Sequence, residues 1–270
     1  MNKEIIKSIV LSQKEAIKFD EKIFILRDKI NILDDYLNNN FIIIISGIRR
    51  SGKSMLLQFI KEKKLRSDYY INFDDNRLVN FLLDDFEKLY ESFLELFGEQ
   101  NVFYFDEIQL IEGWEKFVRR LHNEGKKVFI TGSNSTMLSR ELGTHLTGRN
   151  IQIELYPFSF QEFLKYKNFT FSKNDIYLPQ NKAKIKNYLD EYINLGGFPE
   201  FLLISNKEFF KNLYDNILFK DVITRYNLRD ERILKELLYF VNSNISNEVS
   251  FNKLKNIFGL SNANTIKEYI

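Results

Sequence analysis

The sequence predicts an α/β fold, in which a five-stranded parallel sheet has helices on both faces and an all-helical region follows it. Five short apolar strands alternate with helical patterns over residues 41–155, an alternation typical of parallel sheets with helical crossovers. The first of these strands, Phe41–Ile45, is apolar at every position, as expected of a strand buried on both faces. From residue 182 to residue 240 nearly all apolar residues have helical spacing.

The predicted elements follow one another in a regular order. Strands are expected at residues 41–45, 69–73, 101–105, 127–131 and 150–155. Helices are expected within residues 1–40, from the loop after the first strand to about residue 64, and at residues 77–97, 114–123, 137–142 and 158–168. Gly98 and Gly125 follow two of these helices, where glycine ends a helix without a steric penalty. A polar stretch, 169–181, leads into the later helices, which Gly196–Pro199 interrupt.

The composition excludes several classes of protein. The chain has 270 residues, 44% of them hydrophobic, which is enough for one large domain or two small ones. It contains no cysteine, and therefore no disulfide framework or thiolate metal site. Its net charge of +2 gives no general attraction to nucleic acid. Its apolar runs are far shorter than the ~20 residues that cross a bilayer, and the N-terminus lacks the apolar core of a signal peptide. We expect a soluble, cytoplasmic protein without a membrane partner.

The first strand leads into a phosphate-binding loop. The motif G-x-x-x-x-G-K-S is matched in order by Gly47, Ile48, Arg49, Arg50, Ser51, Gly52, Lys53 and Ser54, and Met55 continues into a helical pattern. The motif requires a strand before it and a helix after it, and both are predicted here. Its glycines allow backbone N–H groups to turn towards phosphate oxygens, and the helix N-terminus adds its dipole. Lys53 would reach the β- and γ-phosphates and Ser54 would bind Mg²⁺. We therefore expect residues 47–55 to bind ATP with Mg²⁺.

An acidic pair follows the third strand. Asp106 and Glu107 come directly after the apolar residues 101–105. An aspartate at this position would hold Mg²⁺, and a neighbouring glutamate would deprotonate the attacking water. An ordinary acidic turn has the same two residues, but the phosphate loop upstream favours the catalytic interpretation.

Further polar residues are candidates for supporting roles. Ser133 and Asn134 follow the fourth strand, where either could position the water or sense the γ-phosphate, although both also suit a helix N-cap. Arg149 precedes the fifth strand and could stabilise charge on the transferred phosphoryl group, within the chain or across a subunit interface. From position alone, a surface arginine is the simpler interpretation of Arg149. Arg49 and Arg50 occupy variable positions of the loop and could face a partner, the phosphates or solvent.

Several stretches of the chain are familiar when taken together. They are GIRRSGKS, FYFDEIQ, GWEKFVRRL, FITGSNS, ELGTHLTGR, LYPFSFQEF and LGGFP, in that order. Over roughly residues 25–270 the chain resembles the prokaryotic AAA-superfamily ATPases with a GxRRxGKS phosphate loop. The resemblance implies an AAA-like P-loop core, a lid-like helical region, a C-terminal winged helix and often a nuclease-like domain. It assigns the phosphate loop to Gly47–Ser54, the Mg²⁺-binding and catalytic acids to Asp106 and Glu107, the sensor to Ser133 and Asn134, and a catalytic arginine to Arg149.

The resemblance divides the chain into four segments. They are an N-terminal helical segment at 1–24, an AAA-like domain at 25–168, a lid-like helical region at 169–240 and a partial winged helix at 241–270. In the last segment, Phe251, Leu254 and Ile257 share a helix face, a turn follows at 259–261, and a second helix starts at Asn264. The wing is missing, so we expect a truncated protein or a shortened gene product.

The charge of the last segment bears on DNA binding. Residues 244–270 contain three lysines and two glutamates, a net charge of +1. This is weak for a DNA-binding face. A helical packing module is an equally good interpretation of the helix–turn–helix.

The leading hypothesis for function is an Mg²⁺-dependent ATPase whose nucleotide state moves the helical region. The alternative is a nucleotide-gated DNA-binding switch with little turnover. A P-loop kinase is disfavoured, because the order of motifs fits the AAA pattern and no acceptor-binding signature is visible. A homo-oligomer is expected if Arg149 acts across an interface. Phosphate release with ATP alone would favour the ATPase, and ATP-dependent retention of DNA without turnover would favour the switch.

Overall fold

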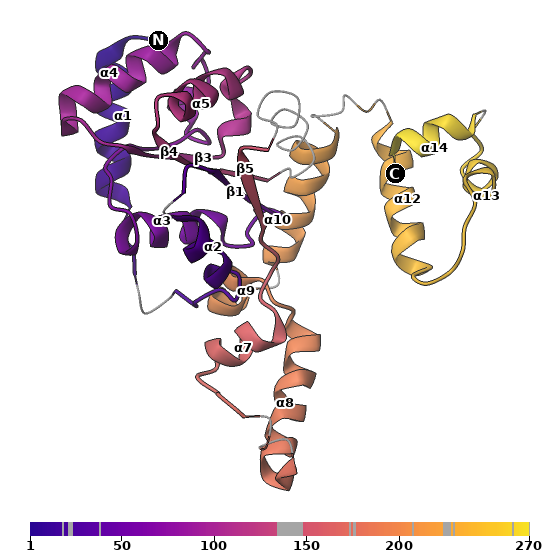
Figure 1. The fold of residues 1–270 in the computed structure, drawn as a ribbon. Coiled ribbons are helices and arrows are strands. Elements are labelled where there is room, and N and C mark those ends of the chain that lie inside the picture. Colours follow the sequence, from indigo (N-terminus) through magenta and orange to yellow (C-terminus); the bar gives the residue numbers. More distant parts are fainter. Residues whose placement is uncertain are drawn as a thin grey trace. The chain divides into compact units, whose positions relative to one another are not determined.

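The chain forms two compact units, Met1–Ser205 and Asn206–Ile270, in a computed structural model (Figure 1). The structure describes residues 1–17, 19–20, 24–37, 39–133, 148–172, 174, 177–206, 208–223, 228, 230–260 and 262–269. The boundary between the units falls inside the helical region that the sequence predicts at 169–240. Among the described helices, none has the length and hydrophobicity needed to cross a membrane.

The first unit is built on a five-stranded sheet with the order β2-β3-β4-β1-β5 (Figure 1). Each pair of neighbouring strands is parallel. The strands are β1 (Ile42–Ser46), β2 (Tyr70–Asn72), β3 (Val102–Asp106), β4 (Lys127–Gly132) and β5 (Asn150–Glu154). The predicted parallel sheet is confirmed, with every strand within about one residue of its expected bounds.

Two hydrophobic cores lie on opposite faces of this sheet, because successive residues of a strand point to opposite sides. Ile42 and Ile44 of β1 pack in one core with helices α1 (Lys3–Ala16), α4 (Asp85–Phe97) and α5 (Trp114–Asn123). Ile43 and Ile45 pack in the other core with α2 (Ile30–Leu37) and α3 (Lys53–Lys63). All five residues of β1 are buried, as its apolar sequence predicts.

Two helical predictions are wrong in extent. Among the described residues of 1–40, only α1 and α2 are helical, and between them Arg27 is tied to the rest of the first unit by side-chain contacts. The helix expected at 77–97 begins at Asp85, because the Asp75 carboxylate caps a short 3₁₀ turn, Asn76–Leu78, by accepting from the Arg77 N–H. The helix expected at 137–142 lies outside the described residues.

Arg27 is the side chain that ties the segment before α2 to the core. It is 5% exposed. Its guanidinium donates to the carbonyl oxygens of Ser51 at 2.8 Å and Tyr156 at 2.5 Å, and to Glu162 Oε1 at 3.0 Å. These partners belong to the loop after β1, to the segment after β5 and to helix α7 (Phe160–Tyr166). One buried arginine therefore joins four parts of the chain.

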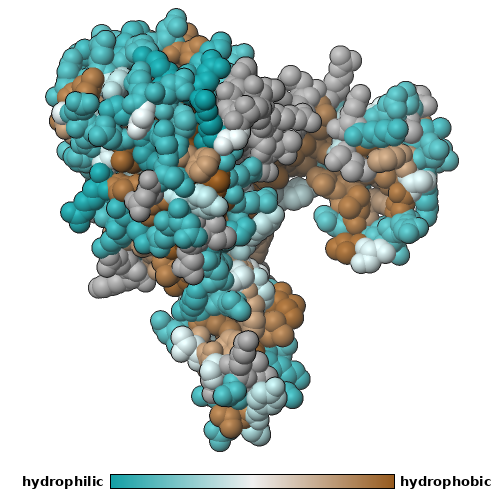
Figure 2. Space-filling view, in the orientation of Figure 1, coloured by the Kyte–Doolittle hydropathy of each residue, from teal (hydrophilic) through white to brown (hydrophobic). Residues whose placement is uncertain are grey.

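The helices after β5 are attached to the core through a glycine turn. α8 (Pro179–Leu195) ends where the sequence predicts a break, and α9 (Pro199–Ile204) follows. The Phe158 N–H donates to the Gly197 carbonyl at 2.7 Å. A Cβ on residue 197 would lie 2.3 Å from the Phe158 carbonyl oxygen, so only glycine fits. Every residue of α8 is at least partly exposed, and apolar surface is visible in this part of the first unit in Figure 2.

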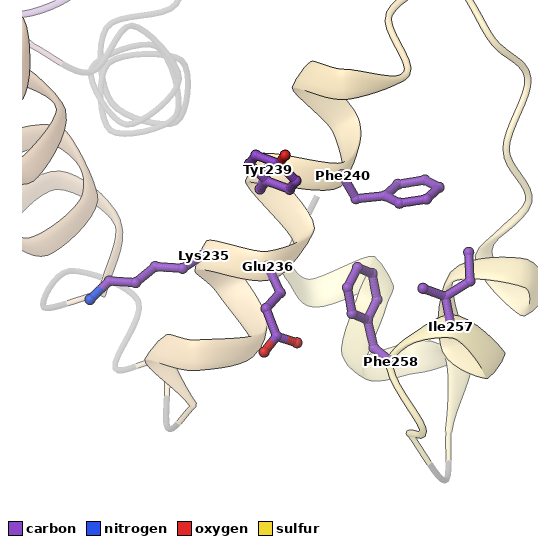
Figure 3. A pocket seen from close by; sticks show the side chains of 6 residues that line it. All are labelled: Lys235, Glu236, Tyr239, Phe240, Ile257 and Phe258. Atoms are coloured by element: carbon purple, nitrogen blue, oxygen red, sulfur yellow. The ribbon is translucent and has the colours of Figure 1, made fainter.

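The second unit is helical. It contains α10 (Glu208–Asn216), a π-helical stretch (Ile217–Ile223), α12 (Glu231–Ser243), α13 (Phe251–Ile257) and α14 (Ala263–Tyr269). Leu218, Ile223 and Leu234 form one hydrophobic cluster, and Leu237, Leu254 and Ile266, one from each of the last three helices, form a second small core. A pocket of about 460 Å³ beside this core is lined by Lys235, Glu236, Tyr239, Phe240, Ile257 and Phe258 (Figure 3). The helical region predicted after the sheet is confirmed.

Lys127, the first residue of β4, is held by backbone carbonyls. Its ammonium donates to the carbonyl oxygens of Tyr36 at 2.7 Å, Asn39 at 2.8 Å and Phe41 at 2.9 Å. Tyr36 belongs to the last turn of α2, and Asn39 and Phe41 lie between α2 and β1, so Lys127 ties this connection to the start of β4. Burial lowers the pKa of Lys127 to about 8.

This lysine gives a testable dependence of stability on pH. Between pH 8 and the ordinary lysine value of 10.5, the unfolded chain holds a proton on Lys127 that the folded chain has lost. Stability therefore rises with pH in that window. Between pH 8 and 10.5, we expect the free energy of unfolding of the wild type to rise by about 1–2 kcal/mol more than that of Lys127→Met. This figure is smaller than the full shift in pKa would give, because solvent screens the partly exposed lysine. Urea denaturation at several pH values measures the difference, and parallel curves for the two proteins would contradict it.

Candidate functional site

The loop between β1 and α3 has the backbone of a phosphate-binding loop. Gly47 has φ +144°, and a Cβ there would lie 2.0 Å from the Leu155 carbonyl oxygen, so no other residue fits. Gly52 has φ +97° at the N-cap of α3, and Arg50 has φ +63°. The loop thus has a positive φ angle at three residues, and it places Lys53 and Ser54 in the first turn of α3.

The side chains of the loop suit an anion. Lys53 is 4% exposed, and its Nζ donates to the Ile48 carbonyl oxygen at 3.2 Å. The Ser51 hydroxyl is buried without a hydrogen-bond partner in the described part of the chain. A buried ammonium and an unpaired hydroxyl, beside a helix N-terminus, fit the phosphates of a nucleotide. Of the remaining loop candidates, Ile48 is exposed, while Arg49 and Met55 are half-buried.

Asp106 ends β3 and is completely buried. The Thr131 hydroxyl donates to its Oδ1, and the Tyr70 hydroxyl donates to its Oδ2 at 3.2 Å. Burial raises the pKa of Asp106 above its ordinary value, although the hydrogen bonds from Thr131, Ser54 and Tyr70 favour the carboxylate. The contact with Ser54 joins the two residues predicted to bind Mg²⁺, and both supply the oxygen ligands that Mg²⁺ prefers.

Glu107 follows Asp106 in a left-handed conformation, with φ 52°. Its backbone N–H donates to the Thr131 hydroxyl oxygen at 3.0 Å. Its carboxylate has two contacts: Oε1 lies 3.5 Å from Lys53 Nζ, and Oε2 accepts from the Gln109 amide. The structure thus brings the acidic pair, Lys53 and Ser54 together at the carboxyl ends of β1 and β3.

The predicted sensor residues are only partly described. Ser133 directly follows β4, and its hydroxyl is buried without a hydrogen-bond partner among the described residues. Asn134 lies outside the described residues. Both sensor roles therefore remain predictions.

Sequence reasoning missed three residues that hold the acidic pair. The Thr131 hydroxyl donates to the Asp106 carboxylate and accepts from the Glu107 N–H. The Tyr70 hydroxyl donates to the Asp106 carboxylate, and the Gln109 amide donates to the Glu107 carboxylate. Tyr70 is the first residue of β2, and Thr131 is the last residue but one of β4. Both strands flank β3, and these contacts can be foreseen only when that strand order is known. Gln109 lies in the stretch FYFDEIQ, two residues after Glu107, without a sequence pattern that indicates its contact.

The loop also contacts the start of α9. Arg50 forms an ion pair with Glu200, and Gly52 packs near Pro199. A Cβ on Gly52 would lie 3.9 Å from Pro199 Cγ. The variable loop position Arg50 therefore faces a helix of the same unit.

Arg149 does not lie beside the loop of its own chain. Its carbonyl accepts from the Ile42 N–H, at the start of β1, and its guanidinium donates to Asn123 Oδ1 at 3.1 Å. The loop leaves β1 at the other end, after Ser46. Four residues of a strand separate the two ends by roughly 13 Å. The structure therefore gives no support to a role within the chain, and a role across an interface stays a prediction.

Comparisons with known families match both parts of the chain. A family model described as an AAA domain matches residues 39–164, and one described as a domain of unknown function (DUF8612) matches residues 186–270. The chain is 41% identical over 236 residues to the uncharacterized protein MJ1544 of Methanocaldococcus jannaschii, covering 86% of this chain and 53% of that protein. It is 34% identical over 236 residues to an uncharacterized protein of Haemophilus influenzae, covering 83% and 56%. The chain spans about half the length of these curated relatives.

Solved structures resemble the chain only distantly. The Aeropyrum pernix Orc1 protein in complex with DNA has 11% identity and a TM-score of 0.37, covering 98% of this chain and 85% of that one. Caenorhabditis elegans PCH-2 has 13% identity and a TM-score of 0.31, covering 98% and 66%. Similarity at these scores supports no conclusion about this chain. The AAA-domain match over residues 39–164, together with the five-stranded parallel sheet and its phosphate loop, shows that this region is an AAA domain of the P-loop class.

Proposed function

We propose that the chain binds ATP with Mg²⁺ at residues 47–54 and hydrolyses it. The observation that carries the proposal is the convergence of Lys53 and the acidic pair at one edge of the sheet, with Lys53 Nζ 3.5 Å from Glu107 Oε1. Ligands of open parallel sheets bind at the carboxyl ends of the strands, and this edge is where β1 and β3 end.

Each residue then has a defined part. Gly47 and Gly52 allow the loop backbone to turn its N–H groups towards phosphate oxygens, and Lys53 adds a positive charge. Ser54 and Asp106 would hold Mg²⁺, which neutralises charge on the phosphate oxygens when bound. Glu107 accepts the proton of the attacking water. Ser133, with its unpaired hydroxyl, and Asn134 would contact the γ-phosphate or that water.

Contacts between the loop and α9 support coupling of the nucleotide to the helices after the sheet. Arg50 lies in the loop and pairs with Glu200 on α9. A phosphate would compete with the Glu200 carboxylate for the Arg50 guanidinium, because both are anions that arginine binds well. Nucleotide binding would thereby weaken one contact between the loop and α9.

Phosphate release from ATP and Mg²⁺, measured with and without DNA, tests the proposed function. Turnover by ATP alone supports an ATPase. ATP-dependent retention of DNA without turnover would replace it by the nucleotide-gated switch, with the helix–turn–helix of α13 and α14 as the DNA contact. The absence of both ATP binding and turnover in a folded protein would overturn the proposal.

Arg149 tests whether the protein works as a homo-oligomer. We expect Arg149→Ala to bind ATP as the wild type does and to hydrolyse it at least about tenfold more slowly, because an arginine finger acts mainly in the transition state. Mixing Arg149→Ala with Glu107→Gln should recover activity, since each protomer supplies what the other lacks. Arg119→Ala is the matched control, because Arg119 is an exposed arginine on α5. A wild-type rate in Arg149→Ala would make Arg149 an ordinary surface residue.

A further inference from the structure

Gln109 lies directly beside the acidic pair and is not explained by the roles above. It belongs to the short 3₁₀ helix Ile108–Leu110, and it is 7% exposed. The left-handed conformation of Glu107, with φ 52°, turns the chain there. The Gln109 side-chain amide Nε2 donates to Glu107 Oε2.

The other end of the Gln109 amide is unpaired. Its Oε1 is buried without a hydrogen-bond partner in the described ranges. An unpaired buried carbonyl is unfavourable, and such a group in a native protein needs an explanation. Rotating the amide by half a turn would place Oε1 against the Glu107 carboxylate, where two acceptors would meet. The amide of Gln109 is therefore oriented so that its N–H group donates to Glu107, although this orientation leaves its own Oε1 without a hydrogen bond.

The contact with Gln109 would persist when nucleotide binds. The Glu107 carboxylate is held by Lys53 at Oε1 and by Gln109 at Oε2. Phosphates would draw the Lys53 ammonium away from Glu107, because phosphate oxygens compete for the same charge. Of these two side chains, Gln109 would then be the one that still contacts the Glu107 carboxylate. A neutral amide donor can fix the orientation of a carboxylate without supplying a proton, so Oε1 stays free to act as the base.

We propose that Gln109 is a positioning residue that orients Glu107 for proton abstraction from the attacking water. This role rests on the proposed ATP hydrolysis and adds to it a residue that acts through Glu107. Orientation of a base within a few tenths of an ångström affects the rate of the chemical step far more than substrate binding.

The test compares Gln109→Met with the wild type. Methionine has a similar length but cannot donate a hydrogen bond. We expect ATP affinity, measured with a fluorescent ATP analogue and Mg²⁺, to stay within about threefold, and kcat to fall about 10- to 100-fold with little change in KM. Gln109→Glu, which keeps the shape and places a second carboxylate beside Glu107, should lower kcat at least as much, and serves if the methionine variant does not fold.

A matched control separates positioning from general destabilisation. Gln100 is a partly buried glutamine before β3, and its Oε1 accepts from the Ser67 hydroxyl and the Asp68 N–H at the opposite edge of the sheet. We expect Gln100→Met to lower the melting temperature without changing kcat.

A double-mutant cycle supplies the decisive readout. If Gln109 acts through Glu107, Gln109→Met should cause no further loss of rate in the Glu107→Gln background, measured in single-turnover assays. An equal loss in both backgrounds would indicate a structural role and overturn the proposal. If the wild type hydrolyses ATP and Gln109→Met hydrolyses it at the same rate, the positioning role is overturned but the proposed hydrolysis is not. A wild-type chain that binds ATP but does not turn it over would overturn the proposed hydrolysis, and this role with it.

Discussion

Glu107→Gln is expected to bind ATP and Mg²⁺ almost normally and to lose turnover by about 10²-fold or more, the contribution typical of a general base. The substitution keeps the size of the side chain and removes its capacity to accept a proton. The glutamine oxygen can still accept from Gln109, so the local structure should change little. The charge that faces Lys53 Nζ at 3.5 Å is lost, which leaves the lysine free for the phosphates.

Isothermal titration calorimetry and a phosphate-release assay measure the two properties of this variant separately. Glu112→Gln is the matched control, because Glu112 is an exposed glutamate a few residues further along the same segment. Turnover at the wild-type rate in Glu107→Gln would mean that another residue is the base. Loss of ATP binding would mean that Glu107 has a role in the ground state.

Lys53→Ala is expected to weaken ATP binding by roughly 10²-fold, because hydrogen bonds from a charged donor to phosphate are among the strongest in proteins. Lys53 is 4% exposed at the start of α3, where no other described lysine contacts the acidic pair. The variant also leaves the Glu107 carboxylate without its cation, so its folding is to be checked by circular dichroism.

Lys61→Ala is the matched control for Lys53, since Lys61 lies two turns further along α3 and pairs with Glu62. Calorimetry on the two variants compares the lysine of the phosphate loop with a lysine of the same helix that lies away from the loop. Unchanged ATP affinity in a folded Lys53→Ala protein would contradict the assignment of the phosphate loop.

The sheet and the phosphate loop could be predicted because their signals are local. The apolar run before Gly47 and the spacing of Gly47, Gly52 and Lys53 depend on neighbouring residues alone. The acidic pair was found for the same reason, since it directly follows a strand. The order of the strands is not a local signal, because β1 pairs with β4 and β5, which lie far from it in the sequence.

The supporting residues could not be predicted because their contacts are made across the sheet. Thr131 reaches Asp106 only when β4 pairs with β3 in the observed register, where Phe105 lies opposite Ile130. The contact of Gln109 depends on the backbone conformation of Glu107, which a sequence pattern does not reveal. The helix predicted through residues 1–40 does not continue through the described residues between α1 and α2, where Arg27 makes long-range contacts in place of local helical bonds.

The contacts of Arg27 also determine how the domain can be cut for laboratory work. The matched AAA region starts at residue 39, and a fragment that starts there lacks Arg27. Glu162, whose side chain is 6% exposed, would lose its cation, and an unpaired buried charge costs about 3–5 kcal/mol. The carbonyls of Ser51 and Tyr156 would lose their donor at the same time. Recombinant fragments of the nucleotide-binding region should therefore begin upstream of residue 27 and extend beyond α7.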